Sequence, residues 1–155
     1  MAPPSILQTL QYLKDMSFEN FILQSSSSPG AMALDVNVNV SVQPVGKPDE
    51  GQDTISGEYE TALLLRVSGR QGDANTPPKP EDKPLFVLEV TLAGRYRFAG
   101  VPKTEVEPFL SIEAPRLLFP FARQIVADAI THGGLPPLLL APIDFLQLYQ
   151  QRTIN

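Results

Sequence analysis

Residues 107–134 read EPFLSIEAPRLLFPFARQIVADAITHGG, and residues 135–145 continue as LPPLLLAPIDF. Within residues 115–132 the apolar side chains recur every three or four positions, which predicts a helix with one apolar face. Pro120 is expected to bend this helix or to mark its true start, because proline lacks the amide donor of a helix interior. Gly133 and Gly134 are expected to end it, since glycine adopts the left-handed conformation of a helix C-terminus without strain.

The segment after the helix is apolar but cannot be regular. In residues 135–143 nearly every side chain is apolar, yet Pro136, Pro137 and Pro142 exclude a helix or a central strand. An apolar extended connection must be covered by its own domain, by another subunit or by a ligand. A short helix is expected to follow it.

Four earlier segments show patterns typical of β-strands, namely residues 10–21, 34–42, 55–69 and 84–99. The clearest is residues 34–42, where Leu or Val alternates with polar residues, the pattern of a strand with one buried face. Gly94 is expected to mark a bulge in the last strand. The order of elements predicts an α+β fold: a four-stranded antiparallel sheet, a long helix, an apolar proline-rich connecting loop and a short C-terminal helix.

Length and composition indicate one domain without targeting or cofactor signals. The 155 residues predict a flexible tail at residues 1–9, a single domain at residues 10–151 and a proline-rich hairpin loop at residues 70–84. A net charge of −5 argues against nucleic acid as a partner. The lack of cysteine and of a long apolar run favours a cytoplasmic protein that does not insert into a membrane.

Residues suited to catalysis are scarce. His132 is the one histidine, and it lies in the last turn of the predicted helix, where it favours the negative end of the helix dipole. No second histidine or cysteine could join it in a metal site, and no phosphate loop or nucleophile motif is present. We therefore expect no catalytic residue, no cofactor and no metal, and the chain is not expected to be an enzyme.

Several motifs together resemble the SecB family of bacterial export chaperones. LFPFAR at residues 118–123, GGLPPL at 133–138 and LAPIDF at 140–145 are similar to the C-terminal half of that family. YLKDMSFEN at residues 12–20 and FVLEV at 86–90 are similar to its opening strand and its long strand. The resemblance runs in order over residues 6–150. It implies an ATP-independent chaperone that holds unfolded secretory precursors and delivers them to the SecA translocase motor.

Acidic residues gain a possible role from this resemblance. From the pattern alone, Asp15, Glu19 and Glu89 are ordinary solvated strand positions, although Asp15 and Glu19 share a face. The family likeness implies that these three acids and Val87 form the patch that docks SecA through its basic, zinc-carrying C-terminal tail. The zinc would belong to SecA.

The likeness also implies a groove for unfolded clients. Its ten residues are Phe21, Ile22, Val36, Val38, Val40, Phe119, Phe121, Leu138, Leu139 and Leu140. An unfolded client has no fixed shape, so such side chains would have to stay exposed. For Phe121 and the valines, the alternative is a plain core position, because one face of any sheet is buried.

Assembly and two other functions complete the expectations. Surplus apolar surface on the last strand and the long helix predicts an oligomer interface, which the likeness makes a homotetramer built as a dimer of dimers. The residues assigned to it are Leu88, Val90, Leu92, Ile125 and Ala129. One alternative is a SecB-like chaperone dedicated to an antitoxin of a stress-response system. The other is a small-ligand binding protein that uses the apolar cleft.

Overall fold

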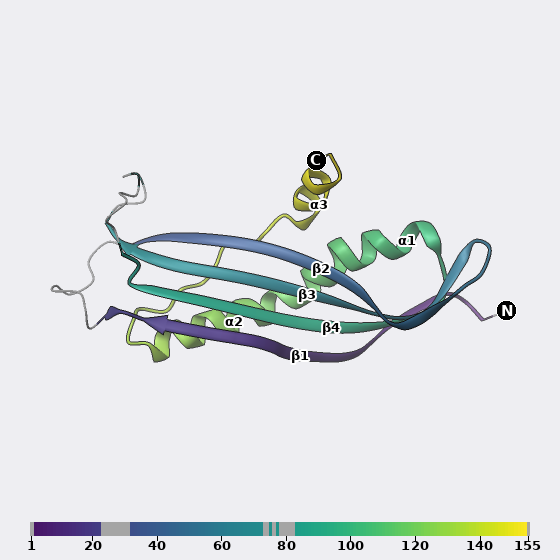
Figure 1. Ribbon diagram of the computed structural model, residues 1–155, viewed down its shortest axis with the longest axis horizontal. Helices are drawn as coiled ribbons and strands as arrows, with labels where there is room; N and C mark the ends of the chain where they lie inside the picture. The colour runs from purple at the N-terminus through teal and green to yellow at the C-terminus, as the bar shows by residue number, and fades with distance from the viewer. Residues whose placement is uncertain (1, 23–31, 73–74, 76, 78–82, 155) are drawn as a thin grey trace.

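Four long strands form one antiparallel sheet in the computed structural model, which describes residues 2–22, 32–72, 75, 77 and 83–154 (Figure 1). The strands are β1 (Ser5–Asn20), β2 (Met32–Glu50), β3 (Thr54–Gln71) and β4 (Phe86–Pro102), and their order in the sheet is β1-β4-β3-β2. Helices follow the last strand. The predicted α+β fold is confirmed.

The helical part begins earlier than its sequence predicts. Helix α1 (Lys103–Pro108), a π-helical turn (Phe109–Glu113) and α2 (Ala114–His132) follow one another without a break. Of the two alternatives predicted for Pro120, the helix start is excluded, since Pro120 lies inside α2. The π-helical turn changes the hydrogen-bond spacing between two prolines that each remove a donor. After an extended connection, α3 (Phe145–Ile154) ends the described chain.

The end of α2 depends on two adjacent glycines for different reasons. Gly134 has a φ of 84°, in the left-handed region that the sequence predicts for this position. Gly133 has an ordinary φ of −77°, but a Cβ atom there would lie 2.8 Å from the Phe18 ring. Asn20 also donates a side-chain hydrogen bond to the Gly133 carbonyl at 2.8 Å. The end of β1 is thereby held against the end of α2.

The core lies between the sheet and α2, which crosses behind β3 and β4 in Figure 1. Alternate residues in the α2-facing halves of β3 and β4 point to this side and pack against the apolar face of α2, whereas Tyr96 and Phe98 pack against Val106 of α1 and Leu110 of the π-helical turn. Leu88, Val90 and Leu92 belong to this set and are 0–3% exposed. They are therefore removed from the predicted oligomer interface, because α2 of the same chain covers them. Ile125 and Ala129, on α2, are only partly buried against the core.

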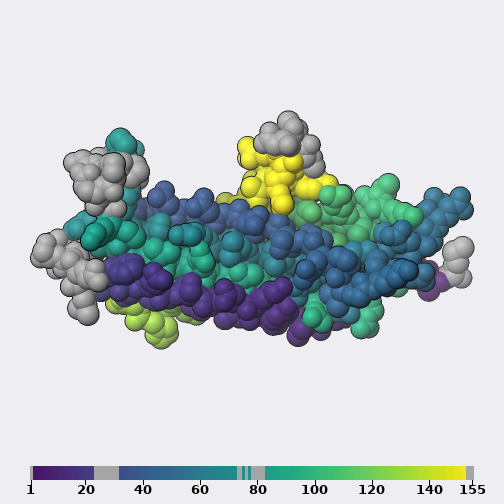
Figure 2. Space-filling view, viewed as in Figure 1, coloured from purple at the N-terminus to yellow at the C-terminus, as the bar shows by residue number. Residues whose placement is uncertain are grey.

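None of the helices among the described residues covers the opposite face of the sheet, which Figure 2 shows as the front of the molecule. We call it the outer face. Its edge strand β1 begins at Ser5, which pairs with Ala99, so residues 5–9 belong to the sheet and not to a tail. One-residue register shifts leave Thr9 and Lys14 as bulged positions.

The last strand contains no bulge at the predicted position. Gly94 pairs in register with Gln11 and with Thr61. A Cβ atom at Gly94 would lie 2.8 Å from the Tyr96 hydroxyl, so glycine makes room for that buried ring. The bulge prediction is wrong because a glycine in a strand can also mark a close approach.

Two connections differ from the sequence pattern. Strand β2 continues to Glu50, beyond the predicted end at residue 42, because polar residues can extend a strand past the part that the core covers. Of the predicted loop at residues 70–84, residues 70 and 71 belong to β3. Residues 73–74, 76 and 78–82 of that loop lie outside the described residues.

Candidate functional site

The sheet register brings the four predicted SecA contacts together on the outer face. Glu19 lies opposite Val87, and Ser17 lies opposite Glu89. Asp15 and Glu19 are therefore each a diagonal neighbour of Glu89, one on either side of it. Asp15 and Glu19 are exposed, whereas Val87 and Glu89 are half-buried. We call Asp15, Glu19, Val87 and Glu89 the acidic surface: three carboxylates with Glu89 in the middle, and one apolar side chain beside Glu19.

Arg66, a cation of the same chain, contacts this surface. Arg66 lies opposite Glu89 in the register of β3 and β4, and its Nη1 lies 2.9 Å from Glu89 Oε1. The Arg66 side chain is 54% exposed and that of Glu89 is 34% exposed. Sequence reasoning missed this pair, because 23 residues separate its members and only the strand register joins them.

A second polar cluster, centred on Glu60, crosses all four strands of the outer face. Glu60 on β3 is 3% exposed, although none of the described helices covers this face. Tyr12 donates its hydroxyl hydrogen bond to Glu60 Oε1, and the Lys14 ammonium lies 2.7 Å from Oε2. Gln43 Nε2 lies 3.2 Å from Oε2, and Arg95 Nε lies 3.7 Å from Oε1. These neighbours cover the carboxylate and supply donors for both of its oxygens.

Hydrogen bonds within the Glu60 cluster shift the pKa values of its members. Burial alone would raise the pKa of Glu60, but hydrogen bonds from Lys14 and Tyr12 bring it below its ordinary value. The hydrogen bond to Glu60 raises the pKa of Lys14 and of Tyr12. Glu60 therefore contributes stability that is present above its unfolded pKa and is lost as the pH falls through the lower folded value. The stabilising effect on Lys14 and Tyr12 is lost only in strongly alkaline solution.

Replacing Glu60 by glutamine should weaken the sheet and change its response to acid. We expect E60Q to lower the free energy of unfolding at pH 7 by about 1–3 kcal/mol, because a charged acceptor for several donors is lost. The wild-type decline below about pH 4.5 should become shallower in E60Q. Urea unfolding followed by circular dichroism from pH 3 to pH 8 measures both effects. D35N, which removes an exposed carboxylate on the same face, should change neither; an E60Q curve parallel to wild type would contradict the role of Glu60.

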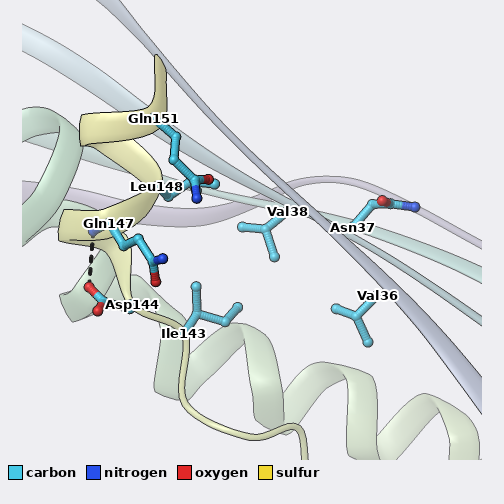
Figure 3. Close-up of a pocket in the computed structure, with 8 residues that line it drawn as sticks. All are labelled: Val36, Asn37, Val38, Ile143, Asp144, Gln147, Leu148 and Gln151. Carbon is cyan, nitrogen blue, oxygen red and sulfur yellow. Dashed lines mark hydrogen bonds between the residues drawn. The ribbon is translucent and has the colours of Figure 1, made fainter. Parts of the chain in front are cut away.

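A groove of mixed polarity lies on the other side of the sheet, between β2 and α3 (Figure 3). It has a volume of about 430 Å³ and is open to the surface. Its lining combines apolar and polar residues, which are Val36, Asn37, Val38, Ile143, Asp144, Gln147, Leu148 and Gln151. Asp144 accepts a hydrogen bond from the backbone N–H of Gln147 at 3.0 Å, which caps the start of α3 beside the groove.

A second hollow lies farther along β2. It measures about 460 Å³ and is lined by Val40, Val42, Glu107, Ser111, Tyr149 and Arg152. Arg152 of α3 donates a hydrogen bond to the Val40 carbonyl at 2.6 Å. The valines of the alternating strand thus border both hollows, as expected for residues that share one face.

The predicted client residues divide into three groups. Val36 and Val38 line the groove, and Val40 borders the second hollow while being 3% exposed. Phe119 and Leu140 are buried in the core and are removed from the groove; the Phe119 ring packs edge-on against Phe145. The others line neither hollow: Phe21, Ile22 and Leu138 are half-buried, and Phe121 and Leu139 are exposed.

Sequence reasoning missed the contribution of α3 to the groove. Asp144, Gln147, Leu148 and Gln151 are spaced at three and four residues, so they occupy one side of a helix. That spacing was the available signal. These α3 residues are partly polar and partly apolar, so the sequence shows no clear apolar face. Only the packing of α3 beside β2 identifies them as part of the groove.

The described residues contain neither a group of metal ligands nor a membrane-spanning helix. No three His, Cys, Asp or Glu side chains there are grouped to hold a metal ion. None of the helices in this part of the chain is both long and apolar enough to cross a membrane. His132 ends α2 and is exposed.

Comparison with known proteins gives a consistent family. The family model described as "Preprotein translocase subunit SecB" matches residues 2–155. "Protein-export protein SecB" of Afipia carboxidovorans is 40% identical over 151 residues, covering 97% of this chain and 83% of that protein. The protein of the same name from Xanthobacter autotrophicus is 39% identical over 153 residues, covering 97% of this chain and 86% of that protein.

A solved structure shares the fold at low sequence identity. It is a SecB-like chaperone of Mycobacterium tuberculosis in complex with a ChAD peptide from the HigA1 antitoxin. The TM-score is 0.64 at 12% identity, and the match covers 89% of this chain and 90% of that chain. The likeness supports the architecture described above.

Proposed function

Because this chain belongs to the SecB family of protein-export chaperones, we propose that it holds unfolded secretory precursors in the cytoplasm without ATP and delivers them to SecA. One observation carries this proposal: the groove and the acidic surface lie on opposite faces of one sheet. A client in the groove would leave the acidic surface free. The chain could then bind its client and SecA at the same time.

The groove suits an unfolded polypeptide better than a small ligand. Val36, Val38, Ile143 and Leu148 offer apolar contacts, while the Gln147 and Gln151 side chains can form hydrogen bonds with a client main chain; the Asn37 side chain points away from Val36 and Val38 (Figure 3). Burying one apolar client side chain would contribute about 1.5–3 kcal/mol before ordering costs. The two hollows beside β2 are open to the surface, which does not favour a ligand pocket of the usual enclosed kind.

The acidic surface suits a basic segment such as the C-terminal tail of SecA. Its three carboxylates would attract lysine and arginine residues, and Val87 supplies an apolar contact at one end, beside Glu19. Charge complementarity of this kind raises association rates and selects partners. The zinc would remain with SecA.

A homotetramer would explain the apolar residues exposed on the edge strand. Leu7, Leu10, Leu13 and Met16 of β1 are 39–59% exposed. A long exposed edge strand with apolar side chains favours aggregation unless something covers it. We propose that a second copy covers it, and that the partly buried Ile125 and Ala129 of α2 contribute to the assembly.

The antitoxin-dedicated chaperone receives less support. The M. tuberculosis structure that suggests it shares the fold with this chain at 12% identity, which does not carry over its client. The relatives near 40% identity are instead named as protein-export proteins.

An aggregation assay tests the proposed function. A chemically denatured secretory precursor is diluted into buffer, and light scattering is followed with and without the purified chain. We expect the chain to suppress scattering at near-equimolar amounts without ATP, and we expect added SecA to form a complex with the chaperone–precursor pair in gel filtration. Full aggregation in its presence would overturn the holding role, whereas suppression without SecA binding would overturn the delivery role alone.

A further inference from the structure

The acidic surface contains a positive charge that belongs to the chain itself. Arg66 contacts Glu89 at 2.9 Å, and both side chains are partly exposed. We propose that Arg66 is an internal competitor at this surface, so that a cationic segment of the docking partner must displace its guanidinium from Glu89. This inference rests on the proposed docking of SecA and adds a residue that sets its affinity.

The position of Glu89 makes this competition direct. Glu89 lies between Arg66 on β3 and Ser17 on β1, with Asp15 and Glu19 at the diagonal positions. A basic segment that contacts the three carboxylates would compete for Glu89, whose Oε1 atom Arg66 already contacts. Because the pair is exposed to solvent, exchange of one cation for another would not leave a buried charge.

Lys14, a second cation near these acids, is engaged elsewhere. It precedes Asp15 in the sequence, and the β-bulge lets both residues face the outer side of the sheet. Its ammonium lies 2.7 Å from Glu60, a carboxylate outside the acidic surface. Glu60 thereby compensates the charge of Lys14, whereas the charge of Arg66 is compensated by an acid of the docking surface itself.

Removal of the Arg66 charge should therefore tighten docking. We expect R66Q to bind a basic partner about twofold to fivefold more tightly, the range of a partly exposed ion pair that no longer has to be broken. The gain should shrink as salt is added, because exposed charges are screened. R66K, which keeps a cation beside Glu89, should bind like wild type.

Arg97 provides a matched control. It is an exposed residue of β4 on the outer face, eight residues from Glu89, and it lies opposite Glu58 in the register of β3 and β4. Eight residues of strand span about 26 Å, well beyond the screening length of about 8–10 Å at ordinary ionic strength. R97Q makes the same change in net charge as R66Q and should alter affinity less than about twofold.

The experiment measures fluorescence anisotropy of a labelled peptide with the sequence of the zinc-loaded SecA C-terminal tail. It compares wild type, R66Q, R66K, R97Q, E89Q and the double variant R66Q/E89Q at two salt concentrations. Support requires that R66Q binds more tightly than R97Q and that R66Q/E89Q binds no more tightly than E89Q. Equal affinities of wild type and R66Q, or equal gains in R66Q and R97Q, would overturn the competition while leaving SecA docking intact. No binding by any variant would overturn the docking function, and this inference with it.

Discussion

Replacing Asp15 and Glu19 together by lysine should weaken SecA binding about a hundredfold or more at low ionic strength. The double change reverses the sign of the acidic surface, because Glu89 would remain as its one carboxylate beside Arg66 and two new lysines. Both positions are exposed on the outer face, so the fold should be retained. Isothermal titration of SecA into the variant at two salt concentrations measures the loss.

A second double variant controls for net charge. Asp49 and Asp53 lie at the β2–β3 hairpin, the end of the sheet remote from the acidic surface, and both are exposed. D49K/D53K should bind SecA within about threefold of wild type, because these positions lie beyond the screening length. If D15K/E19K bound SecA as wild type does at physiological salt, the assignment of the acidic surface would be wrong. The D15K/E19K variant should still suppress precursor aggregation as wild type does.

Placing a charge in the groove should weaken client holding and leave SecA binding unchanged, the reverse of the effects expected for D15K/E19K. Val36 is 41% exposed and lines the groove, so V36D should leave the fold intact while introducing a carboxylate among the apolar contacts. A client side chain would lose about 1.5–3 kcal/mol of burial there, a loss of about tenfold to a hundredfold in affinity for that site. The chaperone concentration that halves precursor aggregation should rise accordingly, and SecA binding should be unchanged.

Leu146 supplies the control for the groove. It is 42% exposed on α3 and lies outside the linings of both hollows. L146D should hold clients nearly as well as wild type. An equal loss in L146D and V36D would point to a general effect of added charge, and normal holding by V36D would remove the groove from the client path.

The D15K/E19K and V36D variants test SecA binding and client holding separately, because the acidic surface and the groove lie on opposite faces of the sheet. Val36 and Val38 point to the face that α2 and α3 border, while Asp15, Glu19 and Glu89 point to the outer face. Successive residues of a strand alternate between these faces. A single sheet can therefore present a client surface and a motor surface without a second domain.

The sequence by itself determined the fold class and the family. Alternation in residues 34–42 predicts a strand with one buried face, and that strand borders both hollows. The motifs LFPFAR, GGLPPL and LAPIDF indicate the SecB family, which the comparisons show. The predicted acids also lie together on one face, as their spacing and the family likeness imply.

Only the tertiary structure decided what covers each face and which distant side chains meet. Periodicity shows that Leu88, Val90 and Leu92 share a face, but not that α2 of the same chain buries them. The pairs of Arg66 with Glu89 and of Lys14 with Glu60 depend on strand register and on a one-residue bulge. A local pattern encodes the direction of a side chain relative to its own strand, whereas its neighbours come from segments far away in the chain, which only folding brings into contact.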